Sequence, residues 1–176
     1  IADPRSEKMQ KNLNLKVKFR ESFRPFAPAV IEEDLNDWFD SETSNSYMLL
    51  VSNVKDSKLI NNSVKSEGFD QLNDKRSEIP AVTHVDNSAR IQTVNEKSNK
   101  RFHELLKEFK KITNVPILIN TSFNIRGEPI VSSVEDAFRC FMGTNLDILV
   151  CENYVILKKD NKSQKDVNYK DKFKLD

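Results

Sequence analysis

The spacing of hydrophobic residues near the start of the chain predicts two short helices with a core strand between them. Met9, Leu13 and Val17 recur every four residues, which places them on one face of a helix of about three turns. Residues 23–29 are rich in phenylalanine and proline and cannot continue this helix, because each proline removes a backbone donor. We expect extended chain there, leading into a strand. Residues 31–39 return to helical spacing and predict a short amphipathic helix.

The middle of the chain predicts strands around a polar loop. The apolar run 47–51 has the length and content of a buried strand, although its periodicity alone does not separate strand from buried helix. Residues 55–78 are polar, mixed in charge and poor in large apolar groups, which is typical of a loop or an insertion. Residues 81–85 and 90–94 predict two further strands, joined by a tight turn at Asp86-Asn87-Ser88.

The strongest helical pattern covers residues 96–112. Its apolar positions lie three and four residues apart and predict one buried face, made by Phe102, Leu105, Leu106, Phe109 and Ile112. The β-branched run 115–119 predicts a buried strand, and 128–131 a second short one after a turn at 124–127.

The last part of the chain predicts one helix, a final strand region and a tail. A capping-box pattern at 132–136 marks the start of a helix that Gly143 would end. Residues 148–157 predict one or two strands. Lysine and aspartate dominate 160–176, so we expect a flexible lysine-rich tail after a domain that covers 1–159.

Composition and charge exclude several classes of protein. The 176 residues carry 28 basic and 27 acidic side chains and only three glycines. This length suits one domain with a real core, and the balanced charge gives no electrostatic reason to expect a nucleic acid partner. No apolar stretch approaches the roughly 18 to 20 residues that span a bilayer, so we expect a soluble protein with no membrane partner.

Two further features bear on location and completeness. Cys140 and Cys151 lie eleven positions apart in apolar surroundings, which indicates neither a disulfide framework nor a zinc site and fits a reduced cytoplasm. The chain begins with Ile1 and shows no secretory pattern there. We therefore expect it to be cut from a longer protein, and a domain of this size could hold half of an active site.

Histidine and cysteine chemistry is not favoured by the sequence. We expect His103 on the exposed side of its helix, which argues against a histidine-based zinc site. His84 and Asp86 would share a face on a strand, and a structural pair explains this better than catalysis does. We expect both cysteines to be buried and inert.

A cluster of cations surrounds the proline-rich segment. On a strand, Lys18 and Arg20 would point to the same face, with Arg24 close behind them. Two fixed cations on one face suit a polyanion, because a guanidinium binds two phosphate oxygens and a lysine adds a movable charge. A solvated basic edge would show the same pattern, and the pattern alone favours that edge.

Short polar side chains follow the predicted strand 115–119. Open α/β sheets bind ligands at such strand ends, because the strand fixes the residues and the loop exposes them. An Asx or serine turn that merely ends the strand fits equally well. The residues concerned are Asn120, Thr121, Ser122 and Asn124, with Arg126 and Gly127.

A long part of the chain resembles the C-terminal domain of the NodU/CmcH carbamoyltransferases. The resemblance is carried by NVPILINTSFNIRGEPIV at 114–131 and EDAFRCF at 135–141. It continues in order over nearly the whole chain, at 2–5, 18–28, 81–93 and 145–153. Only the 55–78 region and the lysine-rich tail lie outside it.

That family's C-terminal domain is similar to the YrdC fold of threonylcarbamoyl-AMP synthases, whose signature is a KxR pair followed much later by SxN. Here the pairs are Lys18 with Arg20, and Ser122 with Asn124. The resemblance implies an α/β (α+β) protein with a twisted, mixed open sheet flanked by helices. It also implies a domain that binds ATP, with magnesium as counterion, and carbamoyl phosphate, and that makes carbamoyl-adenylate.

The resemblance implies a partner in the same polypeptide. In the family, a preceding actin-like domain passes the carbamoyl group to a hydroxyl acceptor. This chain lacks that domain and its metal-binding histidines, so iron or another metal would bind only there and the fragment alone should not complete the reaction. A homodimer is left open.

The expected site residues follow from the family's chemistry. Joining a carbamoyl oxygen to the α-phosphate of ATP requires fixed cations and donors where negative charge gathers. We expect Lys18, Arg20 and Arg90 to do this, and Asn87, where the family usually has glycine, to keep the left-handed turn before Arg90. The expected ligand-binding residues are Lys18, Arg20, Arg90, Asn120, Thr121, Ser122 and Asn124, with Arg126, Arg24 and Arg139 as weaker candidates; no metal ligand is expected in this chain.

Two other functions remain open. The chain could be a module that has lost catalysis and binds a nucleotide or RNA, although its near-zero net charge weakens the RNA version. It could also perform threonylcarbamoyl-AMP chemistry for tRNA modification. The long resemblance to carbamoyltransferases argues against threonylcarbamoyl-AMP chemistry. The KxR and SxN pairs alone would not separate the two reactions.

Overall fold

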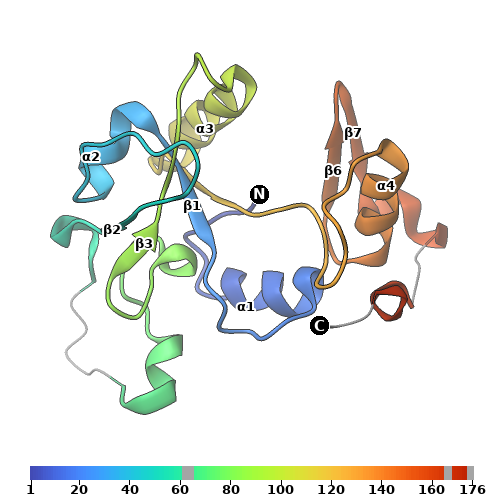
Figure 1. Ribbon diagram of the computed structural model, residues 1–176, viewed down its shortest axis with the longest axis horizontal. Helices are drawn as coiled ribbons and strands as arrows, with labels where there is room; N and C mark the ends of the chain where they lie inside the picture. Colours follow the sequence, from blue (N-terminus) through green and yellow to red (C-terminus); the bar gives the residue numbers. More distant parts are fainter. Residues whose placement is uncertain (61–65, 165–167, 174–176) are drawn as a thin grey trace. The chain divides into compact units, whose positions relative to one another are not determined.

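The computed structural model describes residues 1–60, 66–164 and 168–173. Contacts divide the chain, coloured by sequence in Figure 1, into two compact units. Unit 1 comprises Ile1–Gln10 and Pro25–Thr121, and unit 2 comprises Lys11–Arg24 and Ser122–Asp176. The single domain expected over 1–159 stays a prediction.

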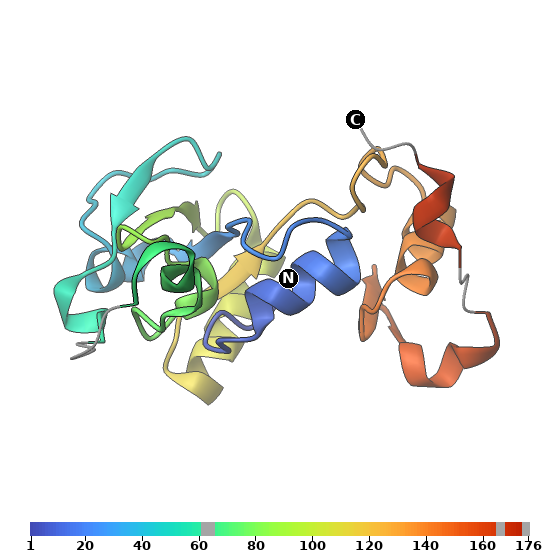
Figure 2. The same ribbon diagram turned by 90° about the horizontal axis from the view of Figure 1, so that it is seen from below.

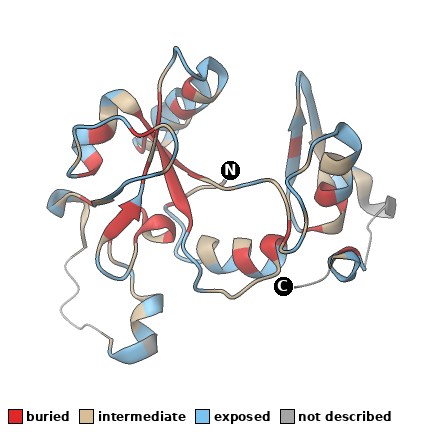
Figure 3. Cartoon of the chain, in the orientation of Figure 1, coloured by how far each residue is buried: buried red, intermediate tan, exposed pale blue. Residues whose placement is uncertain are grey.

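A mixed three-stranded sheet forms the core of unit 1. Its strands are β1 (Ala27–Ile31), β4 (Gln92–Val94) and β5 (Ile117–Asn120), in the order β4-β1-β5. β1 runs parallel to β4 and antiparallel to β5, so Ala29 is paired on both sides. All five residues of β1 are buried, as Figure 3 shows. The core strand expected after the proline-rich segment is therefore confirmed.

Helix α3 (Lys100–Thr113) packs against this sheet, as Figures 1 and 2 show. Its fully buried Leu106 lies in one apolar cluster with residues of β1 and β5. The helix begins after Asn99, whose side chain accepts a hydrogen bond from the backbone N–H of Phe102 at 3.2 Å. The helix expected over 96–112 is confirmed, with its first turn displaced.

The buried face of α3 differs from the predicted face. His103 is only 2% exposed, so its expected place on the solvent side is wrong. Its Nε2 lies 3.0 Å from Glu33 Oε1, and this carboxylate gives the buried imidazole a hydrogen-bond partner. Ile112 is 84% exposed and Leu105 is also exposed. These two residues are seven positions apart and lie along the flank of the stripe centred on Leu106.

Smaller elements complete unit 1. A 3-10 turn at Glu32–Asp34 and α2 (Leu35–Trp38) form the short helix expected over 31–39, with Leu35 and Trp38 buried. β2 (Val51–Asn53) pairs antiparallel with β3 (Ser88–Arg90).

The strand expected over 47–51 is wrong except for Val51, which begins β2. Tyr47 is 83% exposed. Asn45 explains the difference, because its side chain bonds to backbone groups that would otherwise pair with a neighbouring strand. Its Oδ1 accepts from the N–H of Leu49, and its Nδ2 donates to the carbonyl of Ile91, both at 3.0 Å.

The strand expected over 81–85 is also wrong. Pro80–Val82 is a 3-10 turn with proline at its start, and the Thr83 hydroxyl donates to the Ile79 carbonyl at 3.0 Å. The turn that follows is confirmed, with Asn87 left-handed at φ 65° as expected. The 90–94 pattern is confirmed as β3 and β4, on either side of Ile91.

The loop expected over 55–78 stays a prediction, and its residues 61–65 lie outside the described part of the chain. The described part contains 3-10 turns at Asp56–Lys58 and Gly68–Asn73. A bridge pairs Leu59 with Ser77.

Unit 2 combines a helix end, a second helix and a hairpin. α1 (Met9–Leu13) begins in unit 1 and continues as a π-helical turn at Asn14–Lys18, which confirms the first helix. α4 (Val134–Gly143) begins after Ser133, whose Oγ accepts from the N–H of Asp136 at 3.1 Å, so the N-cap of the predicted helix and its end at Gly143 are confirmed. β6 (Ile148–Cys151) and β7 (Tyr154–Leu157) pair antiparallel.

Helices and strands occur together in both units, and the α/β class is confirmed.

Two segments of unit 2 depart from the expected pattern. Residues 128–131 form no strand, because the carbonyl and the carboxylate of Glu128 bond back to Asn124 and Ile125 instead of to a neighbouring strand. In the expected tail, Lys158–Gln164 and Tyr169–Lys172 form 3-10 turns, and Tyr169 is 3% exposed. The flexibility of the tail stays a prediction, and its residues 165–167 and 174–176 lie outside the described part.

Candidate functional site

Lys18 occupies the last position of the first helix and is only 4% exposed. Phe19 then takes a left-handed conformation at φ 50° and ends the helix. Lys18 and Arg20 therefore do not share a strand face, and that expectation is wrong. The end of the helix, not a strand, directs the Lys18 side chain toward Ser122 and Asn124 of the same unit.

The Lys18 ammonium is surrounded by oxygens of the loop after β5. Its Nζ donates to Ser122 Oγ at 3.2 Å, to the Asn124 carbonyl at 3.0 Å and to Asn124 Oδ1 at 3.1 Å. It also contacts the Ser122 carbonyl, and Ser122 Oγ donates to Asn124 Oδ1 at 2.6 Å. Lys18 of the KxR pair thus contacts both residues of the SxN pair, although the two patterns are far apart in sequence. We call Lys18, Ser122 and Asn124 the lysine cluster.

Among the described residues of unit 2, the charge of Lys18 is only partly offset. Burial, followed by the neighbouring Arg20 charge, lowers the pKa of Lys18 to about 8, while Cys140 and Glu128 act in the opposite direction. All four atoms that accept from the ammonium are neutral oxygens. The cluster therefore favours an anion close by.

Arg20 is positioned by an asparagine that the sequence patterns did not single out. Arg20 Nε donates to Asn14 Oδ1 at 2.6 Å, and Asn14 Nδ2 donates to the carbonyls of Ser22 and Arg24 at 3.0 and 2.8 Å. Asn14 is fully buried, so it fixes the turn that carries both arginines. Burial, followed by the Arg24 charge, lowers the pKa of Arg20.

The weaker arginine candidates are all ion-paired. Glu21 accepts from Arg24 Nε at 2.8 Å and from Arg126 Nη1 at 3.3 Å. Arg139 pairs with Asp136, one turn earlier on α4. Each of these three arginines therefore has an acidic partner in the described part of unit 2.

The remaining candidates belong to unit 1. Asn120 ends β5 and donates through Nδ2 to Gln92 Oε1 at 2.7 Å, and Thr121 follows it half-buried. Arg90 is exposed on β3. The turn before it is held by Ser88, whose Oγ donates to Asp86 Oδ1 at 2.7 Å and lies 2.9 Å from His84 Nδ1. The chain does not stay extended after β5, because Asn124 lies in a bend.

The loop that carries Asn124 is held from its far side by Glu128. Asn124 Nδ2 donates to the Glu128 carbonyl at 2.7 Å, and the Ile125 N–H donates to Glu128 Oε2 at 2.8 Å. The Tyr169 hydroxyl donates to Glu128 Oε1. Burial, followed by Glu128, raises the pKa of the Cys140 thiol to about 12, consistent with an inert core cysteine.

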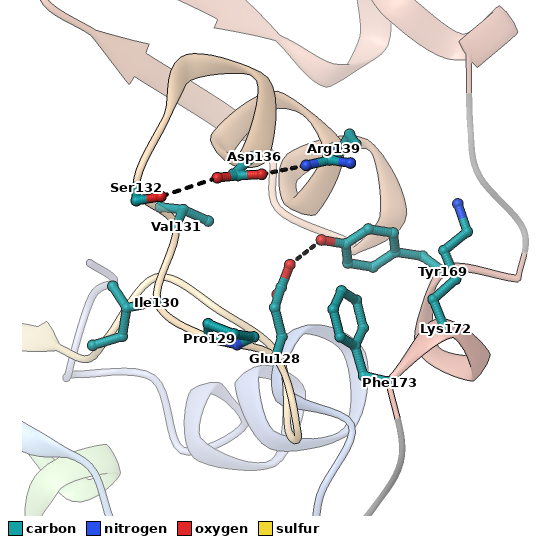
Figure 4. Close-up of a pocket in the computed structure, with 10 residues that line it drawn as sticks. All are labelled: Glu128, Pro129, Ile130, Val131, Ser132, Asp136, Arg139, Tyr169, Lys172 and Phe173. Carbon is teal, nitrogen blue, oxygen red and sulfur yellow. Dashed lines mark hydrogen bonds and ion pairs between the residues drawn. The ribbon is translucent and has the colours of Figure 1, made fainter.

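A pocket of about 360 Å³ opens beside this loop, and Figure 4 shows its lining. Pro129, Ile130, Val131 and the ring of Phe173 form its apolar part. Its polar groups are those of the Ser132–Asp136–Arg139 and Glu128–Tyr169 interactions, with Lys172.

Comparison with known proteins identifies the family of this chain. The family described as Carbamoyltransferase C-terminus matches residues 1–158. The chain belongs to this family. Its relatives include an uncharacterized Synechocystis protein, 47% identical over the whole of this chain and 29% of the relative. Nodulation protein NolNO of Sinorhizobium fredii is 43% identical over 90% of this chain, and nodulation protein U of Rhizobium tropici is 39% identical over 72%.

This carbamoyltransferase C-terminus spans less than a third of the length of those relatives: 29%, 21% and 19% respectively. In its described residues, no helix has the length and apolar character needed to cross a membrane. Nor do three or more His, Cys, Asp or Glu side chains gather there in a way that could hold a metal ion.

Proposed function

We propose that this chain is the adenylate-forming domain of an ATP-dependent O-carbamoyltransferase. It binds ATP and carbamoyl phosphate, forms carbamoyl-adenylate, and supplies it to a preceding actin-like domain that carbamoylates a hydroxyl acceptor. The observation that carries the proposal is the lysine cluster, a buried ammonium held by neutral oxygens in a member of a carbamoyltransferase family.

The chemistry explains why such a cluster is needed. Water first cleaves carbamoyl phosphate to carbamate and phosphate. A carbamate oxygen then bonds to the α-phosphorus of ATP, the α–β phosphoanhydride breaks, and pyrophosphate leaves. Negative charge accumulates on the α-phosphoryl oxygens and on the leaving group, where preorganised cations are most effective. Lys18 and Arg20 supply these charges in unit 2.

The other site residues act through hydrogen bonds. The Ser122 and Asn124 side chains orient the ammonium and offer donors and acceptors to the carbamoyl amide. Arg90, Asn120 and Thr121, which belong to unit 1, stay predicted ligand-binding residues. Magnesium enters only as the counterion of the ATP phosphates, and we place the reaction in the cytoplasm.

Membership of a carbamoyltransferase family supports carbamoyl transfer as the class of reaction. The greater length of the relatives supports a second domain in the full protein. The test is exchange of radioactive pyrophosphate into ATP by the full-length protein. We expect exchange that requires carbamoyl phosphate. Exchange with threonine and bicarbonate instead would show threonylcarbamoyl-AMP chemistry, and nucleotide binding without any exchange would show a binding module. Either outcome overturns the proposal.

A further inference from the structure

Glu128 contacts the lysine cluster through its backbone, not its side chain. The Glu128 carbonyl accepts from Asn124 Nδ2 at 2.7 Å. A carbonyl can only accept, so this bond fixes the orientation of the Asn124 amide and turns Oδ1 toward Lys18 Nζ, 3.1 Å away. The position of the Glu128 backbone therefore determines which atom of Asn124 faces the ammonium.

The Glu128 carboxylate is in turn held by the loop backbone and by Tyr169. Oε2 accepts from the Ile125 N–H at 2.8 Å, and this closes the loop between Asn124 and Glu128. Oε1 accepts from the hydroxyl of Tyr169, drawn in Figure 4. The Tyr169 ring packs in one buried cluster with Ile125 and Cys140, so the hydroxyl is held in place. Tyr169 lies beyond residues 1–158, which the family match covers.

We propose that Glu128 is a positioning residue for the lysine cluster and that Tyr169 holds its carboxylate in place. A chain of contacts then runs from Tyr169 through Glu128 and Asn124 to Lys18. The role in catalysis rests on the proposed adenylate chemistry, whereas the electrostatic effect on Lys18 does not.

The electrostatic environment of Lys18 supports the proposal. Among the described residues, three charged or titratable groups act on its ammonium: Arg20 from the following turn, Cys140 from α4 and Glu128 from the loop. Arg20 favours loss of the proton, whereas Glu128 favours its retention. Glu128→Gln keeps the shape of the side chain but removes that charge.

The first experiment measures Lys18 directly, without activity. The lysines of the full-length protein are methylated with ¹³C, the Lys18 signal is identified by its loss in Lys18→Arg, and its titration is followed by NMR. We expect Glu128→Gln to lower the Lys18 midpoint by roughly half a pH unit or more, because a nearby opposite charge is lost. Glu128→Asp, which keeps the charge, should restore most of the shift. Glu135→Gln on α4 removes an exposed carboxylate and is the matched control.

The second experiment measures the exchange reaction. We expect Tyr169→Phe to lower kcat about tenfold with little change in KM, and Tyr154→Phe, on an exposed tyrosine, to leave both unchanged. Glu128→Gln should also move the alkaline limb of the pH profile to lower pH. An unchanged Lys18 midpoint in a folded Glu128→Gln protein, or unchanged kcat in Tyr169→Phe, overturns the inference. Absence of exchange in the unmodified protein overturns the proposed function alone, because the NMR titration still tests Glu128.

Discussion

Asn124 Oδ1 lies 3.1 Å from Lys18 Nζ, although 106 positions separate the two residues in the chain. This contact joins the end of the first helix to the loop after β5 and places a buried cation against an amide whose orientation is fixed by Glu128. It explains why two polar patterns so far apart in sequence belong to one site.

Removing the ammonium should abolish most of the exchange activity. We expect Lys18→Met in the full-length protein to reduce carbamoyl-phosphate-dependent exchange about 100-fold or more, the usual loss when one preorganised donor is removed. Lys16→Met, on an exposed lysine of the same helical turn, is the control. Ser122→Ala, which removes only one exposed hydroxyl partner, tests the same cluster with less risk to folding, and full activity in both folded variants would contradict the role of the cluster.

The depressed pKa of Lys18 predicts opposite effects of pH on stability and activity. The folded state releases the Lys18 proton near pH 8, whereas the unfolded lysine keeps it to about 10.5. Between these values the unfolded state binds more protons, so the free energy of unfolding gains a contribution that rises with pH. Activity that needs the charged ammonium should fall over the same range.

Urea unfolding and exchange rates measured between pH 7 and 10 check this prediction. The stability of the unsubstituted protein relative to Lys18→Met should increase with pH. A constant difference would show that Lys18 titrates normally.

Asn14 should be important for both stability and the position of Arg20. Asn14→Ala removes the donor to the carbonyls of Ser22 and Arg24 and the side-chain acceptor of Arg20 Nε, and we expect a loss of about 1–3 kcal/mol in the free energy of unfolding. Asn12→Ala, at an exposed position of the same helix, should cost little. Equal unfolding midpoints for the two variants in urea would refute the role of Asn14.

Sequence patterns predicted those helices and strands in which the spacing of apolar residues follows one buried face. β1, α3, α4 and the β6–β7 hairpin follow their apolar spacing or capping residues, because these determine local structure directly. The strands expected at 47–51 and 128–131 failed, because the side chains of Asn45 and Glu128 bond to backbone groups that a strand would have paired. Such side-chain bonds depend on tertiary position and leave no periodic signal.

The contact between Lys18 and the loop after β5 was predicted, whereas the residues that hold Arg20, Asn124 and Glu128 in place were not. Lys18, Ser122 and Asn124 were expected together only through the family resemblance, and the structure brings them into contact. Asn14, Glu128 and Tyr169 carry no motif of their own in the sequence. Asn14 holds Arg20, Glu128 holds Asn124, and Tyr169 holds Glu128 through hydrogen bonds that composition and spacing do not reveal.

Gly143 should tolerate no larger side chain while Tyr169 is packed against it. A Cβ at position 143 would overlap the Tyr169 ring, so we expect Gly143→Ala to destabilise the protein by about 1–3 kcal/mol. Adding Tyr169→Ala should make the glycine substitution nearly neutral, as a double-mutant cycle of unfolding free energies can measure. Additive effects would show that Tyr169 does not pack there.

The most direct test of the central claim is carbamoyl-phosphate-dependent ATP–pyrophosphate exchange in Arg20→Ala and Asn124→Ala of the full-length protein. Arg101→Ala and Asn36→Ala, at exposed positions of unit 1, are the matched controls. We expect each of the two site variants to lose most of the exchange while both controls retain it. Undiminished exchange in Arg20→Ala and Asn124→Ala would contradict the assignment of this site to carbamoyl-adenylate formation.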